Sequence, residues 1–283
     1  MTSPIPVAVL GTGPLADRIA AHPGLVVTEH SPVVLHLSPD PAELTALLGA
    51  GRNVVTALPL HDLSLAELAE ACRAGAATLH ATGGHQSAVA ARLTRSLAAA
   101  TREITRIELI EEIVVPELGA DADSARTAAE AAAGYYIDGL RTLADGAFAR
   151  HGTPTPAGTG EHATPTGERA TATPTVTVAV TTDGSGAVER VTADHALGDR
   201  VHYRSVRSRS GAVPLRYRLV STTAAGTGTA TVDFHPVDGV PPAEHLALVE
   251  LLNAARAIDA SPPGIALRDL AITYLARDDR LVR

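Results

Sequence analysis

A glycine-rich turn stands between an apolar run and a helical pattern at the start of the chain. The apolar run covers residues 6–10, and the turn after it reads Gly11, Thr12, Gly13, Pro14 and Leu15. Gly11 permits a tight turn, Gly13 permits the close approach of a pyrophosphate, and the small Ala16 lets the helix pack on the strand. Since a helix N-terminus adds exposed N–H groups and partial positive charge, the pattern predicts a dinucleotide site. The alternative interpretation is an ordinary glycine turn between a strand and a helix.

Short apolar segments alternate with helical patterns through the N-terminal part of the chain. The segments predicted as strands are 25–27, 33–37, 53–58 and 77–83, and the predicted helices among them are 40–49, 64–74 and 87–99. In the first of these helices Asp40 is the expected cap, Pro41 suits the first position and Glu43 completes a capping box. Gly75 is expected to end the second. Such alternation is typical of a parallel sheet covered by helices.

The connection between segments 25–27 and 33–37 is too short for the usual crossover helix. Six Cα steps separate Val27 from Val33 and reach roughly 20 Å when fully extended, whereas a parallel return usually needs about a dozen residues or more. Either the two strands are antiparallel, or they are short and the link crosses the sheet taut. In both cases the third Rossmann strand and its helix, which often frame the adenosine end of a cofactor, are missing. This counts against an ordinary cofactor site.

Glu29 lies in this link, eighteen residues after Gly11. That is near the usual position of the acidic residue that binds a ribose hydroxyl, so NAD is favoured over NADP. In the alternative interpretation Glu29 caps a hairpin and faces water.

The character of the sequence changes after residue 102. The expected elements are a strand over 102–115, an Ala-rich helix over 123–149, a loop over 151–173, strands between 174 and 234 and a helix over 241–258. Hairpin signals at 183–186, 210–211 and 225–226 indicate an antiparallel sheet. The predicted fold is therefore α/β, with a Rossmann-like, mostly parallel N-terminal sheet, truncated after its second strand, and an α+β domain with an antiparallel sheet. We expect a dinucleotide-binding-like domain over 1–102, completed by 241–283, and a substrate and dimerisation domain over 103–240.

Composition excludes several classes of function. The net charge of −8 and the aromatic content of 2% argue against nucleic-acid binding, and no apolar run is long enough to span a membrane. All 23 basic residues are arginine, so Schiff-base and P-loop lysine chemistry is absent. The single cysteine, Cys72, is expected to be packed and inert, and the scattered histidines predict no metal site. No basic segment precedes the N-terminal apolar run, so no signal peptide is expected and the predicted location is cytoplasmic.

Several short motifs, taken in order, resemble a known family. They are His22-Pro23-Gly24-Leu25, residues 51–56, residues 79–83 and, near the C-terminus, residues 252–254, 261–265 and 269–270. Together they resemble the dihydrodipicolinate reductase-like dehydrogenases, nearest the branch that contains diaminopentanoate dehydrogenase and the native amine dehydrogenases. The likeness covers most of residues 1–100 and the last forty or so, and it is diffuse across the middle, where this chain is shortened.

The resemblance implies an NAD(P)-binding domain, a second sheet that forms a homodimer, and hydride transfer between a nicotinamide and a C=N or C=O carbon of a small molecule. It assigns Gly11, Gly13 and Ala16 to the phosphates, and residues 53–56 of the predicted strand 53–58 to the nicotinamide. The amine dehydrogenases have an acidic residue after this strand, where the present chain has Asp62. The His-His and Lys motif of dihydrodipicolinate reductase is absent.

Candidate catalytic groups follow the predicted strands, because ligands bind at the carboxyl ends of strands in α/β sheets. His61 and Asp62 follow one strand and suit acid–base work. His85 lies where Gly83 leads into a helix N-terminus that can meet an anion or a carbonyl oxygen. Tyr135, on the helix of the second domain, is a further candidate proton donor.

Each of these groups has a structural alternative. His61 and Asp62 then form a solvent-facing pair, His85 only starts a helix, and Tyr135 packs. His80, in mid-strand, is expected to be a hydrogen-bonded core residue. Six arginines on two strands either clamp a substrate carboxylate or, as we favour, form a solvated face. They are Arg200, Arg204, Arg207, Arg209, Arg216 and Arg218.

The sequence therefore predicts an NAD(P)-dependent oxidoreductase that acts on an imine, amine or carbonyl of a small molecule. Two alternatives stay open. One is a homologue without the cofactor that performs lyase, isomerase or cyclase chemistry in specialised metabolism. The other is a non-catalytic binding protein.

Overall fold

The computed structural model describes residues 4–82, 84–98, 103–148, 173–259 and 261–266. The chain divides into two compact units, Met1–Val89 with Phe234–Arg283, and Ala90–Asp233. Within the described ranges, no helix combines the length and the apolarity that crossing a membrane requires.

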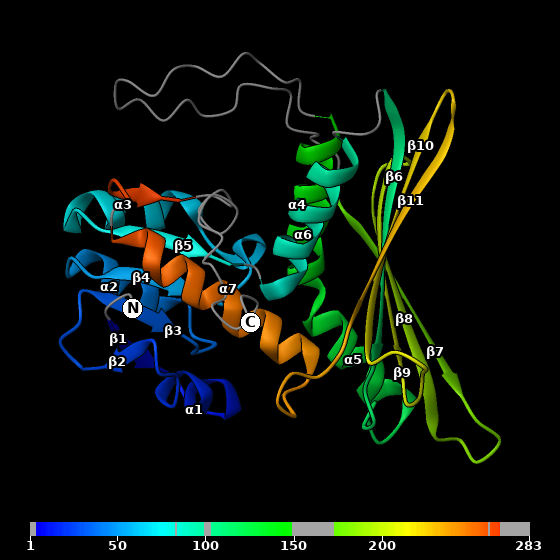
Figure 1. Ribbon diagram of the computed structural model, residues 1–283, viewed down its shortest axis with the longest axis horizontal. Coiled ribbons are helices and arrows are strands. Elements are labelled where there is room, and N and C mark those ends of the chain that lie inside the picture. Colours follow the sequence, from blue (N-terminus) through cyan, green and yellow to red (C-terminus); the bar gives the residue numbers. More distant parts are fainter. Residues whose placement is uncertain (1–3, 83, 99–102, 149–172, 260, 267–283) are drawn as a thin grey trace, which may run out of the picture. The chain divides into compact units, whose positions relative to one another are not determined.

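The first unit is built on a six-stranded sheet in the order β12-β5-β4-β3-β1-β2 (Figure 1). Its strands are β1 Ile5–Leu10, β2 Leu25–Val27, β3 Val33–His36, β4 Asn53–Thr56, β5 Thr78–Ala81 and β12 Gly264–Ile265. Its helical segments are α1 Pro14–Ala20, α2 Ala42–Gly49, η1 Leu60–Asp62, α3 Leu65–Gly75, the start of α4 Gly84–Ala98, and α7 Pro242–Ile258. All of the paired strands run parallel, which confirms the predicted Rossmann-like domain.

Two apolar layers hold helices on opposite faces of this sheet. The layer against α7 includes Val7, Val33, Leu35, Val55, Leu251, Leu252 and Ile258. The layer against α2 and α3 includes Ala8, Val34, Val54, Leu79, Leu44, Leu48, Leu68 and Cys72. Because successive strand residues point to opposite faces, strands buried on both sides are continuous apolar runs, as the sequence shows.

A stagger of β2 and β3 along β1 explains the short link between them. Val27 lies opposite Val7, and Val34 lies opposite Ala8 on the other side of β1. The end of β2 and the start of β3 therefore lie at about the same position along β1. The link between them crosses only two strand spacings, about 10 Å. The hydroxyl of Ser31 secures it by donating to a β1 carbonyl at 2.8 Å. The crossing link is the correct alternative, but it is not taut, and residues 28–32 contain no third Rossmann strand or helix.

The end of α3 differs from the prediction. Gly75 is the last helical residue, and Ala76, with φ 49°, makes the left-handed turn. A Cβ on Gly75 would lie 1.9 Å from the carbonyl oxygen of Leu48. This glycine is therefore required for the close packing of α3 on α2, not for ending the helix.

The second unit is a six-stranded sheet in the order β11-β10-β6-β9-β8-β7, with two helices packed on it (Figure 1). Its strands are β6 Ile104–Val114, β7 Thr175–Thr182, β8 Val188–Leu197, β9 Val201–Ser208, β10 Leu215–Thr223 and β11 Gly226–Phe234. The helices are α5 Ala122–Ala131 and α6 Ala133–Phe148. The strands β6 and β9 are parallel, whereas β6–β10, β8–β9 and β7–β8 are antiparallel, so the sheet is mixed.

Three expectations for this unit need correction. The antiparallel prediction fails at β6–β9, and residues 210–211 make no hairpin because β9 and β10 lie on opposite sides of β6. The hairpin signals at 183–186 and 225–226 do join neighbouring strands. The Ala-rich segment is two helices, since α5 ends at Ala131 and α6 begins at Ala133. The predicted loop over 151–173 lies outside the described residues except for its last residue.

Candidate functional site

The order of the strands reverses between β1 and β3. From β1 the chain proceeds to β2 on one side, and from β3 it proceeds to β4, β5 and β12 on the other. In open α/β sheets, ligands bind outside the carboxyl ends of the strands at such a reversal. The segments at this point are the glycine turn after β1 and the connection after β3, and these define the candidate site.

The two glycines of the turn have different roles. Gly11 has φ +121°, and a Cβ there would lie 2.9 Å from the backbone carbon of Leu37. Gly11 therefore lets the turn pack closely on the connection that follows β3. Gly13 has φ +111°, and a Cβ there would meet no atom of the described residues within 4 Å. As far as the described residues go, the space beside Gly13 is open, as the approach of a pyrophosphate requires.

Helix α1 begins directly at this open space. Pro14 occupies the first turn, where the missing N–H costs nothing. The first helical hydrogen bond runs from the Asp17 N–H to the Gly13 carbonyl at 3.1 Å. The amides of Leu15 and Ala16 precede this bond, so they belong to the free N–H groups of a helix N-terminus. Thr12 is exposed between the two glycines. The turn thus has the donors and the room that a phosphate needs.

Glu29 is exposed just beyond β2. Its backbone carbonyl accepts a hydrogen bond from Arg52 at 3.1 Å. The hairpin in the alternative interpretation is wrong, because β2 and β3 are both parallel to β1 and do not pair with each other, but the exposure of Glu29 that it also predicted is observed. The carboxylate sits after the second strand, at the place from which a ribose diol is bound in Rossmann sheets.

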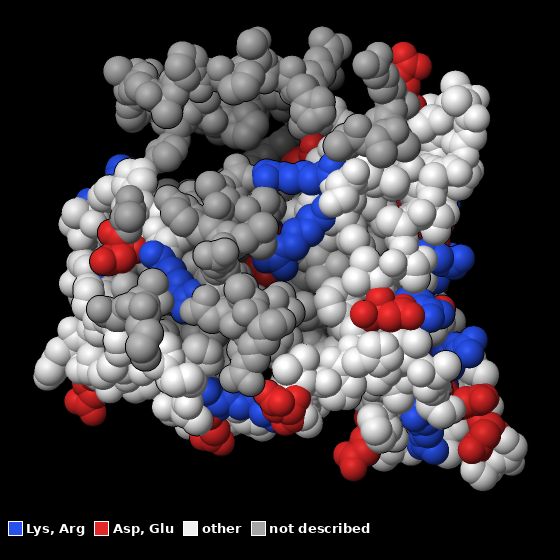
Figure 2. All heavy atoms as spheres, in the orientation of Figure 1, with Lys and Arg blue, Asp and Glu red and all other residues white. Residues whose placement is uncertain are grey.

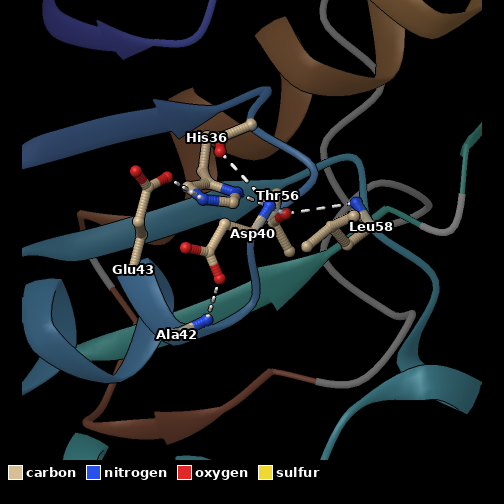
Figure 3. Close-up of polar contacts among 7 residues, drawn as sticks. His36, Asp40, Ala42, Glu43, Thr56 and Leu58 are labelled. Carbon is tan, nitrogen blue, oxygen red and sulfur yellow. Dashed lines mark hydrogen bonds and ion pairs between the residues drawn. The ribbon is translucent and has the colours of Figure 1, made fainter.

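A buried histidine links three elements beside the strand reversal (Figure 3). His36 is the last residue of β3 and is fully buried. Its Nδ1 lies 3.1 Å from the Thr56 hydroxyl and its Nε2 lies 3.3 Å from Glu43 Oε2. Burial lowers the pKa of His36, while Glu43 and Asp40 oppose this effect by favouring the imidazolium. The histidine is a neutral hydrogen-bonding group near pH 7.

The predicted capping box is wrong because of this histidine. The N-cap of α2 is Pro41, one residue later than predicted, and the Oδ1 of Asp40 before it accepts from the Ala42 N–H at 2.9 Å. Glu43 does not return to the Asp40 amide, which donates instead to Ser38 at 3.2 Å. The Glu43 side chain turns to His36 (Figure 3).

The other sequence candidates are placed as follows. His61 is exposed in η1, and the side chain of Asp62 is outside the described set. His85 is buried in the first turn of α4, and Tyr135 is half-buried on α6 of the second unit. Gly83 lies outside the described residues. Catalytic roles for these residues stay predictions. The described residues contain no group of three or more His, Cys, Asp or Glu side chains that could hold a metal ion.

Two core predictions are confirmed. His80 is buried, its Nδ1 lies 2.8 Å from the Ala266 carbonyl oxygen, and burial lowers its pKa. Cys72 is buried, and desolvation raises the pKa of its thiol, as expected of an inert cysteine.

Two of the six arginines of the second sheet are paired with carboxylates on its surface. Arg204 contacts Asp194 at 2.5 Å, and Arg216 contacts Asp233 at 2.6 Å. Arg200 donates to a β6 carbonyl at 3.0 Å. Figure 2 shows acidic and basic atoms interspersed on the visible face of this unit. These contacts favour the solvated face for Arg200, Arg204 and Arg216, whereas Arg207 is turned inward and donates to the Tyr136 hydroxyl at 3.4 Å.

The second sheet also buries a polar cluster that sequence reasoning missed. Glu111 is buried, whereas Glu112, on the opposite face of β6, is exposed. Tyr136, Tyr203 and Tyr217 donate hydrogen bonds to the Glu111 carboxyl group, and the Ser205 hydroxyl lies within hydrogen-bond distance of both this group and the Tyr136 hydroxyl. Burial, reinforced by the Glu111 charge, raises the pKa of Tyr136 to about 12. This cluster joins α6 to three strands.

The strand order, the glycine turn and the second sheet are those of the Rossmann-type dehydrogenase fold. The structure is similar to that of amine dehydrogenase from Mycobacterium smegmatis, with a TM-score of 0.64 and 14% identity over 97% of each chain. It is similar to a probable dehydrogenase from Thermotoga maritima, with a TM-score of 0.55 and 11% identity over 96% of this chain and 94% of that one.

It is also similar to GenD2 from gentamicin A biosynthesis, solved in complex with NAD, with a TM-score of 0.51 and 14% identity over 97% of this chain and 92% of that one. No protein-family model and no curated protein matches the sequence. At these identities the likeness establishes the fold, and at that level it confirms the resemblance to the amine dehydrogenases.

Proposed function

We propose that this protein is an NAD(P)-dependent oxidoreductase that transfers hydride between the nicotinamide and a C=N or C=O carbon of a small molecule. The observation that supports this most is the open glycine turn at the strand reversal. Gly13 leaves room for a pyrophosphate among the described residues, and it directly precedes α1, whose first amides are the donors that a helix N-terminus offers an anion. The similarity to GenD2, whose structure contains NAD, supports the same assignment.

NAD is the favoured nucleotide. The exposed Glu29 carboxylate follows β2, where it suits the two hydroxyls of an adenosine ribose and repels the 2′-phosphate of NADP. Calorimetric titration with NADH and NADPH tests this. We expect saturable binding of NADH, and weaker binding of NADPH that improves when Glu29 is replaced by glutamine.

The glycine turn can be tested with a matched pair of variants. Gly13→Ala is expected to raise the Kd for NADH by at least about tenfold, because a Cβ at φ +111° is strained and occupies the open space. Gly264→Ala is the control, since this residue also has positive φ (+138°) and open space but starts β12, at the amino end of a strand. Absence of saturable binding of either nucleotide to the wild type would overturn the proposal, as would equal effects of the two variants.

His61, Asp62 and His85 are the proposed proton carriers, with Tyr135 as a further candidate. Removal of a general acid or base typically lowers a rate by about 10²–10⁴-fold. Once a substrate is found in a panel of imines and ketones, His61→Gln and His85→Gln should be compared with His30→Gln, an exposed histidine of the same unit. The carrier is the residue whose replacement lowers kcat while leaving the Kd for NADH unchanged.

A further inference from the structure

The carboxyl ends of β3, β4 and β5 are joined by side-chain hydrogen bonds that the proposed function does not yet use. His36 and Thr56 are register partners and the last residues of their strands. The backbone carbonyl of Thr56 accepts from the Thr82 N–H at 2.9 Å and from the Thr82 hydroxyl at 3.3 Å. Thr56 is therefore held by its neighbours on both sides.

The hydrogen-bond partners define a direction along this network. The Glu43 carboxylate can only accept a hydrogen bond. The ring proton of His36 is therefore on Nε2, which donates to Glu43. Nδ1 of the neutral ring is then an acceptor, and the Thr56 hydroxyl donates to it. This fixes the hydroxyl so that its oxygen accepts the Leu58 N–H at 3.1 Å (Figure 3). The chain runs from the Leu58 amide through Thr56 and His36 to Glu43.

The Leu58 end of this series of hydrogen bonds lies at the end of β4, where the nicotinamide half of a bound cofactor is expected. The strand β4 is two positions from β1 in the sheet, a distance of about 10 Å. A cofactor whose pyrophosphate binds the glycine turn after β1 extends over about that distance to its nicotinamide. The segment 57–59 leaves β4 at this point, and Ala57 also donates to the His36 carbonyl at 3.2 Å.

We propose that His36, held by Glu43, is a positioning residue that fixes the Thr56 hydroxyl and thereby presents segment 57–59 to the nicotinamide half of the cofactor. This inference rests on the proposed function. The use of Glu43 supports it, because a first-turn glutamate that would otherwise close a capping box is directed to His36.

The test compares two ligands. NADH contains the nicotinamide half, whereas ADP-ribose contains only the phosphates and the adenosine half. Thr56→Val, which keeps the shape but removes the hydroxyl, is expected to raise the Kd for NADH about five- to tenfold and to change the Kd for ADP-ribose less than about twofold. Thr56→Ser restores the hydroxyl and should restore NADH binding. A merely structural role would weaken both ligands together and would overturn the inference.

A variant at a partly exposed residue tests the same network in case the buried Thr56 variants do not fold. The Glu43 side chain is 40% exposed, so Glu43→Ala should fold, and it is expected to weaken NADH binding about two- to threefold. The control is Glu70→Ala, because Glu70 is exposed on α3 and pairs with Arg73. If the wild type binds neither ligand, the proposed function fails and this inference fails with it. If NADH binds and Thr56→Val and Glu43→Ala match the wild type, only the positioning role is wrong.

Discussion

Replacing Glu111 by glutamine is expected to destabilise the second unit by about 3 kcal/mol. The hydroxyls within hydrogen-bond distance of Oε1 are those of Tyr136 at 2.7 Å and Ser205 at 3.3 Å, and those that donate to Oε2 are those of Tyr203 at 3.4 Å and Tyr217. A glutamine has one accepting oxygen, so in either orientation its NH₂ group faces two of these hydroxyls. Each buried donor left without an acceptor costs about 1–3 kcal/mol, and relief of the buried charge offsets part of the sum.

Urea unfolding followed by far-ultraviolet circular dichroism measures this effect, since the chain has no tryptophan. The control is Glu112→Gln, because Glu112 is the exposed neighbour on the opposite face of β6. With a slope of about 2 kcal/mol per molar urea, the midpoint should fall by about 1.5 M. A Glu111→Gln midpoint equal to that of the control would refute the reasoning. It would mean that the carboxyl group is already protonated in the native state and accepts no more hydrogen bonds than an amide does.

Three further predictions concern stability. Gly75→Ala should lower the free energy of unfolding by about 3 kcal/mol, because its Cβ would lie 1.9 Å from the Leu48 oxygen; Gly49→Ala, with open space around it, should change it by less than about 1 kcal/mol in the same urea assay. The pKa of Tyr136 is raised to about 12, so the unfolded chain loses its proton first and stability should fall between about pH 10 and 12; a free energy of unfolding that stays constant over this range would contradict this. Burial lowers the pKa values of His36, His80 and His195. Below about pH 6.5 the unfolded chain therefore binds protons that the folded chain does not, and melting temperatures should fall as the pH decreases from there, whereas a flat profile would contradict the burial argument.

The N-terminal sheet was predictable because local signals and the global fold agree there. The glycine turn, the apolar strands and the helices with their breaks each specify the same alternation. The missing third strand was also predictable, because the length of a link limits where it can go. The stagger of β2 and β3 was not, since register depends on which β1 residues pair with Val27 and Val34, and the residues of β2 and β3 are apolar except for His36.

The polar networks were less predictable than the fold. Glu43 has the spacing of a capping box, and no local feature distinguishes that use from a hydrogen bond to His36. The one available signal for the His36 network was that His36 and Thr56 are polar residues at the ends of two adjacent parallel strands. The Glu111 cluster offers no such signal, because its partners lie between 25 and 106 residues away. Its assembly also depends on the parallel pairing of β6 with β9, which the hairpin signals did not suggest.

The shortened edge of the first sheet changes how a nucleotide would be recognised there. In a full Rossmann sheet a third strand covers β2, whereas here β2 is a three-residue edge strand on which Val26 and Val27 are 50% and 46% exposed. So short an edge offers little backbone for unwanted strand pairing, which explains how the sheet can end at β2. It also removes part of the wall around the adenosine half. Under the proposed function, cofactor binding must therefore depend more on the glycine turn and on the ends of β3 and β4, where His36 and Thr56 hold the backbone in place.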